Sequence, residues 1–535
     1  MSYDYIVVGA GSAGCVLANR LSANPAHRVL LLEAGPPDRN LWIHVPLGYG
    51  KNIDNAAINW CFQSQPEAYC HGQTYFLPRG KVLGGTSAIN GMVYVRGQAE
   101  DFDGWAQSGC RGWSYEDVLP YFVKCETNSR GASELHGGDG PLRVSDVGEQ
   151  TVICKAMLAA GEEIGIPGNE DLNGRVQEGI GWHQATISDG RRSSTAVAYL
   201  KPIRNRTNLD IETNAMARRV LFDGKRATGI EYDIGGTAGG SENRRTAHAG
   251  KAVILCGGAY GSPQLLELSG IGDPARLTEL GIPVLHALPG VGENLQDHFV
   301  GHLRWRVKNA RTFNDRTHGL RALAEGLNYI LRRKGVLTQP TLPVGAFIRT
   351  RPELASPDVQ LQIFTATYQE LRARTLDREP GVTIGAAVLR LEGRGHVHAQ
   401  STDPATQPAI WHNLLATPND RRTLVAGMRV ARTLMGADAM KPYFDFELTP
   451  GDDVQSDGEL IDYARRSGRS NMHPAGTCKM GIDDQAVVDP SLRVHGTQGL
   501  YVADASVMPN VVSGNTNAAT IMIGEKAADL VTATA

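Results

Sequence analysis

The stretch DYIVVGAGSAGCVLANRLSANPAHRVLLLEAG, residues 4–35, decides the fold. Residues 5–8 form an apolar run of the kind that makes a buried parallel strand. Gly9, Gly11 and Gly14 then form G-x-G-x-x-G. Gly9 permits the tight turn, Gly11 leaves room for a pyrophosphate, and Gly14 lets a helix over residues 12–21 sit close to the strand. The free N–H groups at the start of that helix would face the phosphate.

The same stretch ends in an acidic residue. A second apolar run, residues 29–32, leads to Glu33, nineteen positions after Gly14. An acidic side chain there takes the ribose hydroxyls of an adenosine. A lone glycine pattern is a weak signal, but strand, glycines, helix, strand and acid in this order predict a dinucleotide site.

Size and composition indicate an ordinary globular protein. The chain has 535 residues, a formal net charge of −3 and a pI near 6.6, so length favours about two to four domains and the charge excludes a nucleic-acid footprint. No apolar run approaches the roughly 18–20 residues that span a bilayer, although peripheral membrane contact stays open. The first strand starts so early that we expect no signal peptide. Eight cysteines without a C-x-x-C pair favour a reducing cytoplasm and no metal site.

A glycine-rich segment, PRGKVLGGTSAINGMVY at residues 78–94, is the second notable stretch. It follows residues 34–78, which have little periodicity and read as a surface excursion able to cover a ligand. Bare backbone in the segment suits a flat or anionic ligand. A glycine loop that caps a helix at Ser87 is an equally good interpretation of the segment alone.

The remaining pattern predicts two domains of α/β class. Helices are expected over residues 115–125, 151–164 and 264–269, two or three strands over 209–232, and a strand over 251–256 that joins the first sheet. Residues 300–465 predict a mainly antiparallel sheet, with strands at 359–367, 382–391 and 396–400 and helices near 320–331 and 420–435. We therefore expect a Rossmann-like domain from residues 1–155, 205–300 and 466–535, and a substrate domain from 156–204 and 301–465.

The chain closes with a strand at residues 500–503 that ends at Asp504, and with an amphipathic helix over 517–530. The strand has the shape of one that delivers a carboxylate to a flavin, and the helix N-terminus suits negative charge on a reduced ring. Elements that merely complete the fold would show the same periodicity.

At this point the sequence resembles the glucose-methanol-choline (GMC) oxidoreductases, flavoproteins that oxidise alcohols using FAD. The resemblance covers essentially the whole chain through motifs in family order. It is strongest to the bacterial branch with choline, aliphatic alcohol, polyethylene glycol and sorbose dehydrogenases, and it implies an FAD domain of the glutathione-reductase type. The motifs are GAGSAG, the segment at 78–94, GGAYGSPQLLELSGIG at 257–272, VGENLQDH at 291–298, HPAGTCKMG at 473–481, LYVADASVMP at 500–509 and NTNAATIMIGEKAADL at 515–530.

The resemblance assigns roles residue by residue. It implies that His473 is the active-site base and that Asn517, forty-four positions later, is the second catalytic residue. Alcohol oxidation needs a neutral imidazole to take the hydroxyl proton and a second donor to hold the alcohol oxygen, so that hydride faces flavin N5. His298 and His495 are expected to be structural, and His396 and His398 to be sheet residues. FAD contacts are expected from Gly9, Gly11, Ser12, Ala13, Gly14, Glu33, Ala34, Trp60, Arg79, Val82, Gly84, Gly85, Asn90, Gly91, Met92, Val93, Val220, Gly258, Ala259, Asp504, Ala505 and Thr520.

One departure from the family bears on the cofactor. Some members attach FAD through a histidine just before the asparagine that Asn90 matches, and here that position is Ile89, which cannot form the bond. The sequence therefore predicts noncovalent FAD.

Several functions compete. The leading hypothesis is a dehydrogenase for a primary aliphatic or aromatic alcohol that passes electrons to a quinone, cytochrome or other carrier. An oxidase of the same family that reduces O₂ comes next, then a lyase, a noncatalytic flavin-binding protein and a nicotinamide enzyme. For each of these functions we expect a cytoplasmic location, with or without association with a membrane. Residues 42–70 and 359–367 are expected to line the substrate entrance.

Overall fold

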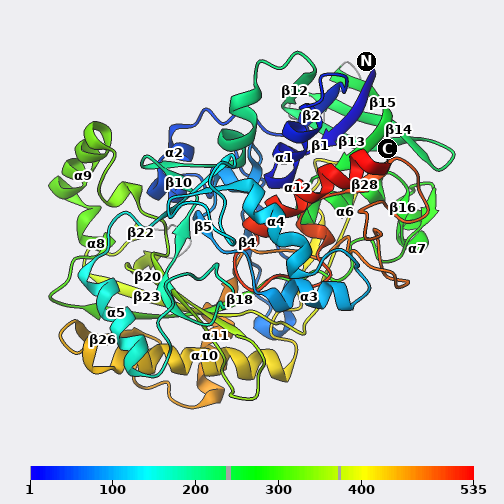
Figure 1. Ribbon diagram of the computed structural model, residues 1–535. Helices are drawn as coiled ribbons and strands as arrows, with labels where there is room; N and C mark the ends of the chain where they lie inside the picture. Colours follow the sequence, from blue (N-terminus) through cyan, green and yellow to red (C-terminus); the bar gives the residue numbers. More distant parts are fainter. Residues whose placement is uncertain (1, 236–242, 371–374, 535) are drawn as a thin grey trace.

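A largely parallel sheet forms one end of the molecule (Figure 1). The computed structural model describes residues 2–235, 243–370 and 375–534. β1 lies between β2 and the C-terminal part of β15, all parallel, and β12 extends the sheet beyond β2 while β28 pairs with the end of β15. The strands are β1 (Ser2–Val8), β2 (Val29–Glu33), β12 (Leu209–Thr213), β15 (Arg244–Leu255) and β28 (Leu500–Val502). The predicted first unit is confirmed.

An antiparallel ribbon extends this sheet. β13 (Ala215–Asp223) and β14 (Arg226–Ile234) pair with each other, and β14 pairs with the N-terminal part of β15. The turn between them contains Gly224, whose φ of 56° is a conformation that glycine adopts without strain. The predicted strands are confirmed, and β15 begins seven residues before the expected strand.

Helices α1 (Ser12–Leu21) and α12 (Asn517–Thr534) pack together, and α12 also packs on α4 (Tyr115–Cys125). Arg20 of α1 makes two hydrogen bonds, of 2.8 and 2.7 Å, to the buried carboxylate of Glu525 in α12. Residues 518–528 of α12 are all buried. The expectation of an amphipathic closing helix is therefore wrong, because neighbouring elements cover it on all sides along these residues.

Helix α6 (Gly258–Leu268) follows β15 directly and begins six residues before the predicted helix. Pro263 lies inside it and cannot donate to the carbonyl of Ala259, which is why the sequence favours a later start. The Thr477 hydroxyl donates to that carbonyl at 2.7 Å and replaces the missing bond.

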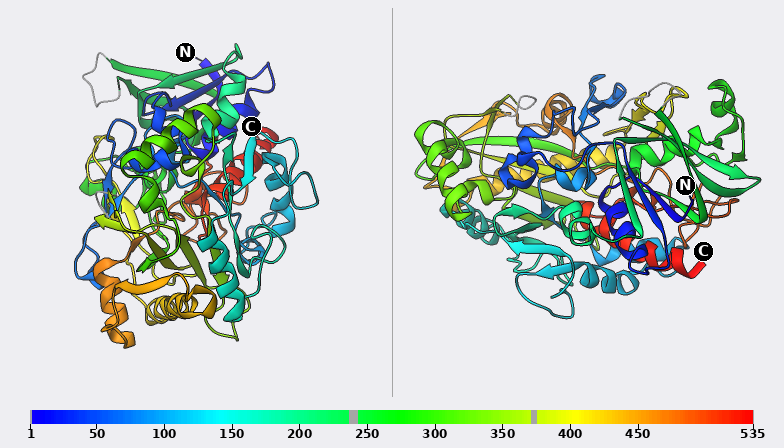
Figure 2. Two further views of the ribbon diagram at one scale, coloured as in Figure 1. Left: turned by 90° about the vertical axis from the view of Figure 1, so that its left-hand side faces the viewer. Right: turned by 90° about the horizontal axis from the view of Figure 1, so that it is seen from above.

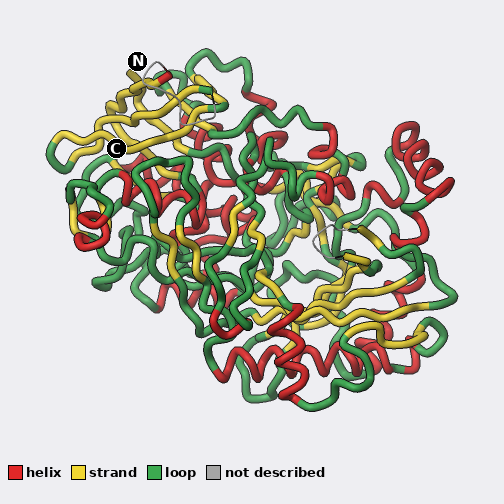
Figure 3. The backbone as a smooth tube through the Cα atoms, turned by 180° about the vertical axis from the view of Figure 1, so that it is seen from behind, coloured by secondary structure: helices red, strands yellow, loops and turns green. Residues whose placement is uncertain are grey.

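A second, antiparallel sheet forms the other end of the molecule, with long loops between the two (Figure 3). Its strand order is β26-β18-β23-β20-β19-β8, with β27 beside β18. Helix α10 packs on β23, β18 and β20, and α11 and α5 lie beside it. The predicted antiparallel sheet is confirmed, except that residues 396–398 pair with β25 in a separate two-stranded sheet. The elements are β8 (Gly179–Trp182), β18 (Phe299–Val307), β19 (Val344–Ile348), β20 (Val359–Phe364), β23 (Gly381–Val388), β26 (Phe444–Thr449), β27 (Arg469–Ser470), α5 (Val152–Glu163), α10 (Pro418–Gly436) and α11 (Asp457–Ser467).

The predicted division into two domains stays a prediction, and some of its boundaries fall inside helices or strands. Residue 155 falls inside α5, residue 300 inside β18, and β27 of the second sheet lies within the segment assigned to the FAD domain. The smaller elements are α2 (Leu41–His44), α3 (Ala99–Gln107), α7 (Pro274–Glu279), α8 (Phe313–Arg316), α9 (Gly319–Arg332), β3 (Phe62–Gln63), β4 (Phe76–Leu77), β5 (Val93–Tyr94), β6 (Glu126–Asn128), β7 (Leu142–Asp146), β9 (Gln184–Ala185), β10 (Ile187–Ser188), β11 (Arg191–Arg192), β16 (Ile271–Gly272), β17 (His286–Ala287), β21 (Tyr368–Glu370), β22 (Thr375–Leu376), β24 (His396–His398) and β25 (Ala409–Trp411).

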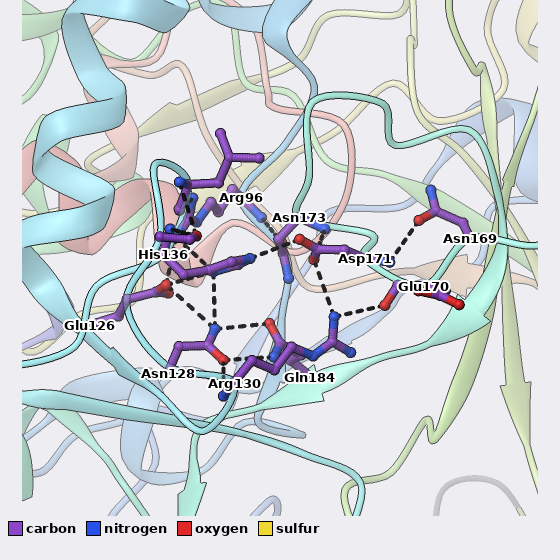
Figure 4. A network of polar contacts seen from close by, with 12 residues as sticks. Arg96, Glu126, Asn128, Arg130, His136, Asn169, Glu170, Asp171, Asn173 and Gln184 are labelled. Carbon is purple, nitrogen blue, oxygen red and sulfur yellow. Dashed lines mark hydrogen bonds and ion pairs between the residues drawn. The ribbon is translucent and has the colours of Figure 1, made fainter.

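A buried ionic network holds the end of the glycine-rich segment in place (Figure 4). Arg96, two residues after β5, lies 2.8 Å from a carboxylate oxygen of Glu126. His136 lies 2.8 Å from the same oxygen through Nδ1 and 2.8 Å from Asp171 through Nε2. Because both ring nitrogens face carboxylates, His136 is a doubly protonated imidazolium that joins its own loop to strand β6 and to the turn at Asp171.

No helix among the described residues is long and apolar enough to cross a membrane.

Candidate active site

One cavity, lined by residues of both sheets and of the loops between them, collects most of the predicted site residues. Its lining includes both predicted catalytic residues and all of the predicted FAD contacts except Gly14, Val82, Gly84 and Val220. Gly14 acts in packing, because a Cβ there would lie 1.8 Å from the Gly9 carbonyl oxygen. Val82 and Val220 are core residues, and Gly84, at φ 91°, bonds backbone to backbone with Ala10.

The N-terminus of α1 forms one end of the cavity. Its N-cap is Gly11, and within the described chain no side chain caps the free N–H groups of the first turn. Gly9 has φ 104°, and a Cβ at that position would lie 2.5 Å from the Cys256 carbonyl oxygen. The free backbone N–H groups of the first turn, next to glycines without side chains, are suited to bind a pyrophosphate.

Two buried carboxylates stand near this end, and the backbone holds both. Glu33 accepts from the amides of Ala10 (3.0 Å) and Gly35 (2.8 Å), and burial raises its pKa to about 7. Asp504 accepts from the Gly258 amide (2.8 Å), the Ser262 hydroxyl (2.6 Å) and the Ser506 amide. Both carboxylates also line the cavity.

The glycine-rich segment forms a side wall of the cavity. In place of a capped helix it makes one 3-10 turn over Gly85–Ala88, so the helix alternative is wrong. Arg192 fixes the segment by donating to Asn90 Oδ1 at 2.7 Å and to the Ser87 carbonyl at 3.1 Å. Ile89 also lines the cavity.

His473 lies at the other end of the cavity and is buried. Its Nε2 is 3.0 Å from the Asn515 amide nitrogen, and its Nδ1 is 3.0 Å from Nδ1 of His298. Its backbone N–H donates to Asp297 at 2.8 Å. Burial, followed by the charges of His298 and Arg79, lowers the pKa of His473 well below its ordinary value.

These contacts select a tautomer. The Asn515 amide nitrogen donates to Nε2 of His473, so the proton of a neutral ring resides on Nδ1, which lies 3.0 Å from His298 Nδ1 and 3.4 Å from the Asn471 amide nitrogen. His298, at the shorter of these two distances, is the acceptor of that proton. Burial also lowers the pKa of His298, to about 4, so that ring is a neutral acceptor. Nε2 is therefore the basic atom of the His473 ring, and His473 lines the cavity.

Asn517 begins α12, and its side-chain oxygen accepts from the Ser12 hydroxyl at 2.7 Å. This bond joins the first residue of α12 directly to the first residue of α1, and both residues line the cavity. It orients the Asn517 amide group, which the resemblance assigned to the alcohol oxygen.

The sequence reasoning missed four contacts of His473. His298, expected to be structural, touches it directly, and Asn471, Asn515 and Asp297 also contact it. Asn515 and Asp297 lie in the NTN and NLQD parts of the quoted motifs. The motifs therefore included these residues but did not predict that they contact His473.

The second sheet supplies the far wall. His302 and Arg304 are two residues apart in β18, so their side chains share the face of the strand that lines the cavity. Arg469 of β27 pairs with Val300 of β18 and also lines the cavity. Buried nitrogens of two of these side chains, His302 Nδ1 and Arg304 Nε, have no hydrogen-bond partner in the described structure. The predicted entrance residues also reach the cavity, through Tyr49, Trp60, Phe62, Gln362 and Phe364.

Glu293, His396 and His398 are the described residues that group at metal-ligand distances. Both ring nitrogens of His398 already face carboxylates, Glu267 at 2.8 Å and Glu293 at 3.0 Å. The expectation of no metal site stays a prediction.

A dinucleotide cradle at one end of a cavity and a neutral buried histidine at the other define a nucleotide-dependent oxidoreductase. Family models described as GMC oxidoreductase match residues 3–300 and 392–524. The chain belongs to the GMC oxidoreductase family.

Similar proteins cover the whole chain. It is 43% identical to the mitochondrial choline dehydrogenase of Homo sapiens, over 99% of this chain and 89% of that protein, and 43% identical to an alcohol dehydrogenase [acceptor] of Pseudomonas putida, over 99% and 95%. Pyridoxine 4-oxidase from Mesorbium loti has a TM-score of 0.88 at 29% identity, covering 98% of each chain. A structure that concerns FAD modification in the formate oxidase of Aspergillus oryzae RIB40 has a TM-score of 0.91 at 26% identity, over 99% and 98%.

FAD is the cofactor that the family and these structures indicate, and the residues present fit it. The glycine cradle and the uncapped first turn of α1 suit its pyrophosphate. The glycine-rich segment leaves bare backbone in the wall of the cavity that the cradle and His473 also line.

Proposed function

We propose that the protein oxidises an alcohol, preferentially a primary one, to the aldehyde and passes the electrons to a quinone or another carrier. His473 acts as the base and Asn517 holds the alcohol oxygen. Bound FAD would supply the oxidant that accepts the hydride. The observation that carries this proposal is the buried, neutral imidazole of His473, which lines the cavity and contacts His298 through Nδ1 and Asn515 through Nε2.

The proton has a defined route in this proposal. The alcohol hydroxyl donates to Nε2 of His473, taking over the contact now made by the Asn515 amide. That amide is then free to donate to the alcohol oxygen. His473 becomes cationic at the moment of reaction, and the neutral ring of His298 at 3.0 Å accepts from its Nδ1 and so stabilises it.

The cavity wall supports a neutral or anionic substrate over a quaternary ammonium. Aromatic side chains that could contact a trimethylammonium group, such as Trp60 and Phe364, do line the cavity, so the argument against choline rests on charge. A carboxylate close to the fixed positive charge would stabilise it, and cationic side chains there would oppose it. Among the described residues that line the cavity, the carboxylates are Glu33 and Asp504, and backbone donors hold both at the other end. Near His473 the sheet presents His302, Arg304 and Arg469.

Anaerobic bleaching of the bound flavin tests both parts. We expect rapid bleaching with a primary alcohol or an ω-hydroxy carboxylate of similar length, and slow bleaching with choline. Arg304→Met would reduce the advantage of the hydroxy carboxylate over the neutral alcohol. Choline as the best substrate would contradict the substrate assignment, and no bleaching by any alcohol would contradict the reaction.

A family oxidase that uses O₂ is the second candidate. Peroxide formation compared with dye reduction, measured on one good substrate, separates the two. Dye or quinone reduction well above peroxide formation supports the dehydrogenase. A noncatalytic flavoprotein would show neither.

A further inference from the structure

Helix α9 presents an apolar face to solvent. Leu320, Leu323, Leu327, Ile330 and Leu331 are 86%, 62%, 51%, 68% and 77% exposed. Their spacing places them on one side of the helix. A helix of a globular protein normally buries that face, and large contiguous apolar patches on a surface mark binding sites.

The structure holds α9 in this orientation. Glu325, on its inner side, accepts from Arg316 at 2.6 Å and from the backbone N–H of Val336 at 3.0 Å. Tyr329 is the buried residue of the helix. Figure 1 shows α9 projecting at the edge of the molecule, and in the left-hand view of Figure 2 the same side faces the viewer. The apolar face is therefore an outward surface of a fixed helix.

Basic side chains border the apolar face. Arg321 lies beside it with a side chain that is 65% exposed and that pairs with Asp315 at 3.2 Å. Exposed Arg332 is the last residue of the helix, and exposed Arg333 and Lys334 follow it. The acidic residue of the helix is Glu325, which faces inward to Arg316. An apolar stripe with a basic border is the pattern of a helix that lies in the surface of an anionic bilayer.

Further apolar residues lie near this helix and lead to the cavity. Leu41 and Trp42 of α2 are 66% and 41% exposed, and α2 packs on the 3-10 turn at residues 46–51, which packs on the turn that follows α9. Tryptophan favours the membrane interface. Val336, after α9, packs in one cluster with Phe364, which lines the cavity.

We propose that the α9 face, with Leu41 and Trp42 beside it, docks the protein on a bilayer that contains anionic lipids. The apolar side chains enter the acyl boundary and the basic border meets the headgroups. Docking brings the cavity wall at Phe364 toward the lipid, where a lipid-soluble electron acceptor resides. This last link rests on the proposed function, whereas the docking itself does not.

Vesicle flotation with the FAD-loaded full chain tests the docking. The vesicles contain phosphatidylcholine alone or phosphatidylcholine with phosphatidylglycerol, at low and high salt. We expect binding to the anionic vesicles that weakens with salt, and a loss of roughly tenfold or more in the variant L323E/L327E. Ile482→Glu, at a residue that is 71% exposed elsewhere, is the matched control and keeps full binding.

The outcomes are distinguishable. Equal binding of L323E/L327E and wild type would overturn the proposal, as would equal binding to neutral and anionic vesicles. A dimer that dissociates in L323E/L327E would also overturn it, because a second copy would then cover the face. Reduction of a soluble dye by alcohol should be unchanged in the variant, so failure of the docking is separable from failure of the proposed function.

Discussion

The buried imidazolium of His136 should make stability depend on pH in a defined direction. Burial opposes its charge, but hydrogen bonds to Asp171 and Glu126 outweigh this and raise its pKa from 6.5 to about 9. The folded value lies above the unfolded one. The stabilisation is therefore complete below pH 6.5 and is lost as the pH rises through 9. The shift corresponds to at most about 3 kcal/mol.

The perturbation is His136→Gln, which keeps a polar side chain but removes the charge. We expect its free energy of unfolding at pH 6 to fall by about 2–3 kcal/mol relative to wild type, and the difference to shrink below about 1 kcal/mol at pH 10. Urea unfolding of the FAD-loaded protein at pH 6, 8 and 10, followed by tryptophan fluorescence, measures this. His71→Gln, in an exposed pair with Asp462, is the control and should change little. A difference between His136→Gln and wild type that is the same at pH 6 and pH 10 would refute the reasoning.

Further predictions concern the active site. Because burial lowers the pKa of His473, kcat/KM for the alcohol should stay constant down to pH 6.5 and fall only at lower pH, where His473 becomes protonated. An inflection of the pH profile above pH 7 would count against a neutral His473 base. Asn515→Ala should lower kcat/KM by about 10–100-fold with FAD content unchanged, and wild-type kinetics would remove Asn515 from the site. Ser12→Ala, which frees the Asn517 amide, should lower kcat by up to about tenfold in single-turnover bleaching, while an unchanged rate would show that the bond is not needed. Acid precipitation should release yellow colour to the supernatant, whereas a yellow pellet would mean covalent FAD despite Ile89.

The sequence predicts best the parts of the fold that depend on local pattern. At residues 5–21 the backbone of the glycine turn and of the following helix lies so close to neighbouring backbone that only glycine fits at positions 9 and 14. Gly9 and Gly14 therefore predict this arrangement from the sequence alone. The start of α6 failed for the opposite reason, because the hydroxyl of Thr477 that compensates for Pro263 lies far away in the chain. The burial of α12 likewise depends on α1 and α4.

The site shows the same division. Motif spacing pointed to His473 and Asn517, which line one cavity. The contact between His298 and His473 bridges 175 positions and follows from the pairing of Phe299 with Ser470, which no local pattern contains. The basic cavity wall also required the register of β18 and β27.

The central claim is that His473 is the base of an FAD-dependent alcohol oxidation. The most direct test compares anaerobic flavin bleaching by a primary alcohol in wild type and in His473→Ala. The account predicts that the variant keeps its FAD absorbance and that bleaching slows by about 10²–10⁴-fold. A variant that retains FAD and bleaches at the wild-type rate would contradict it.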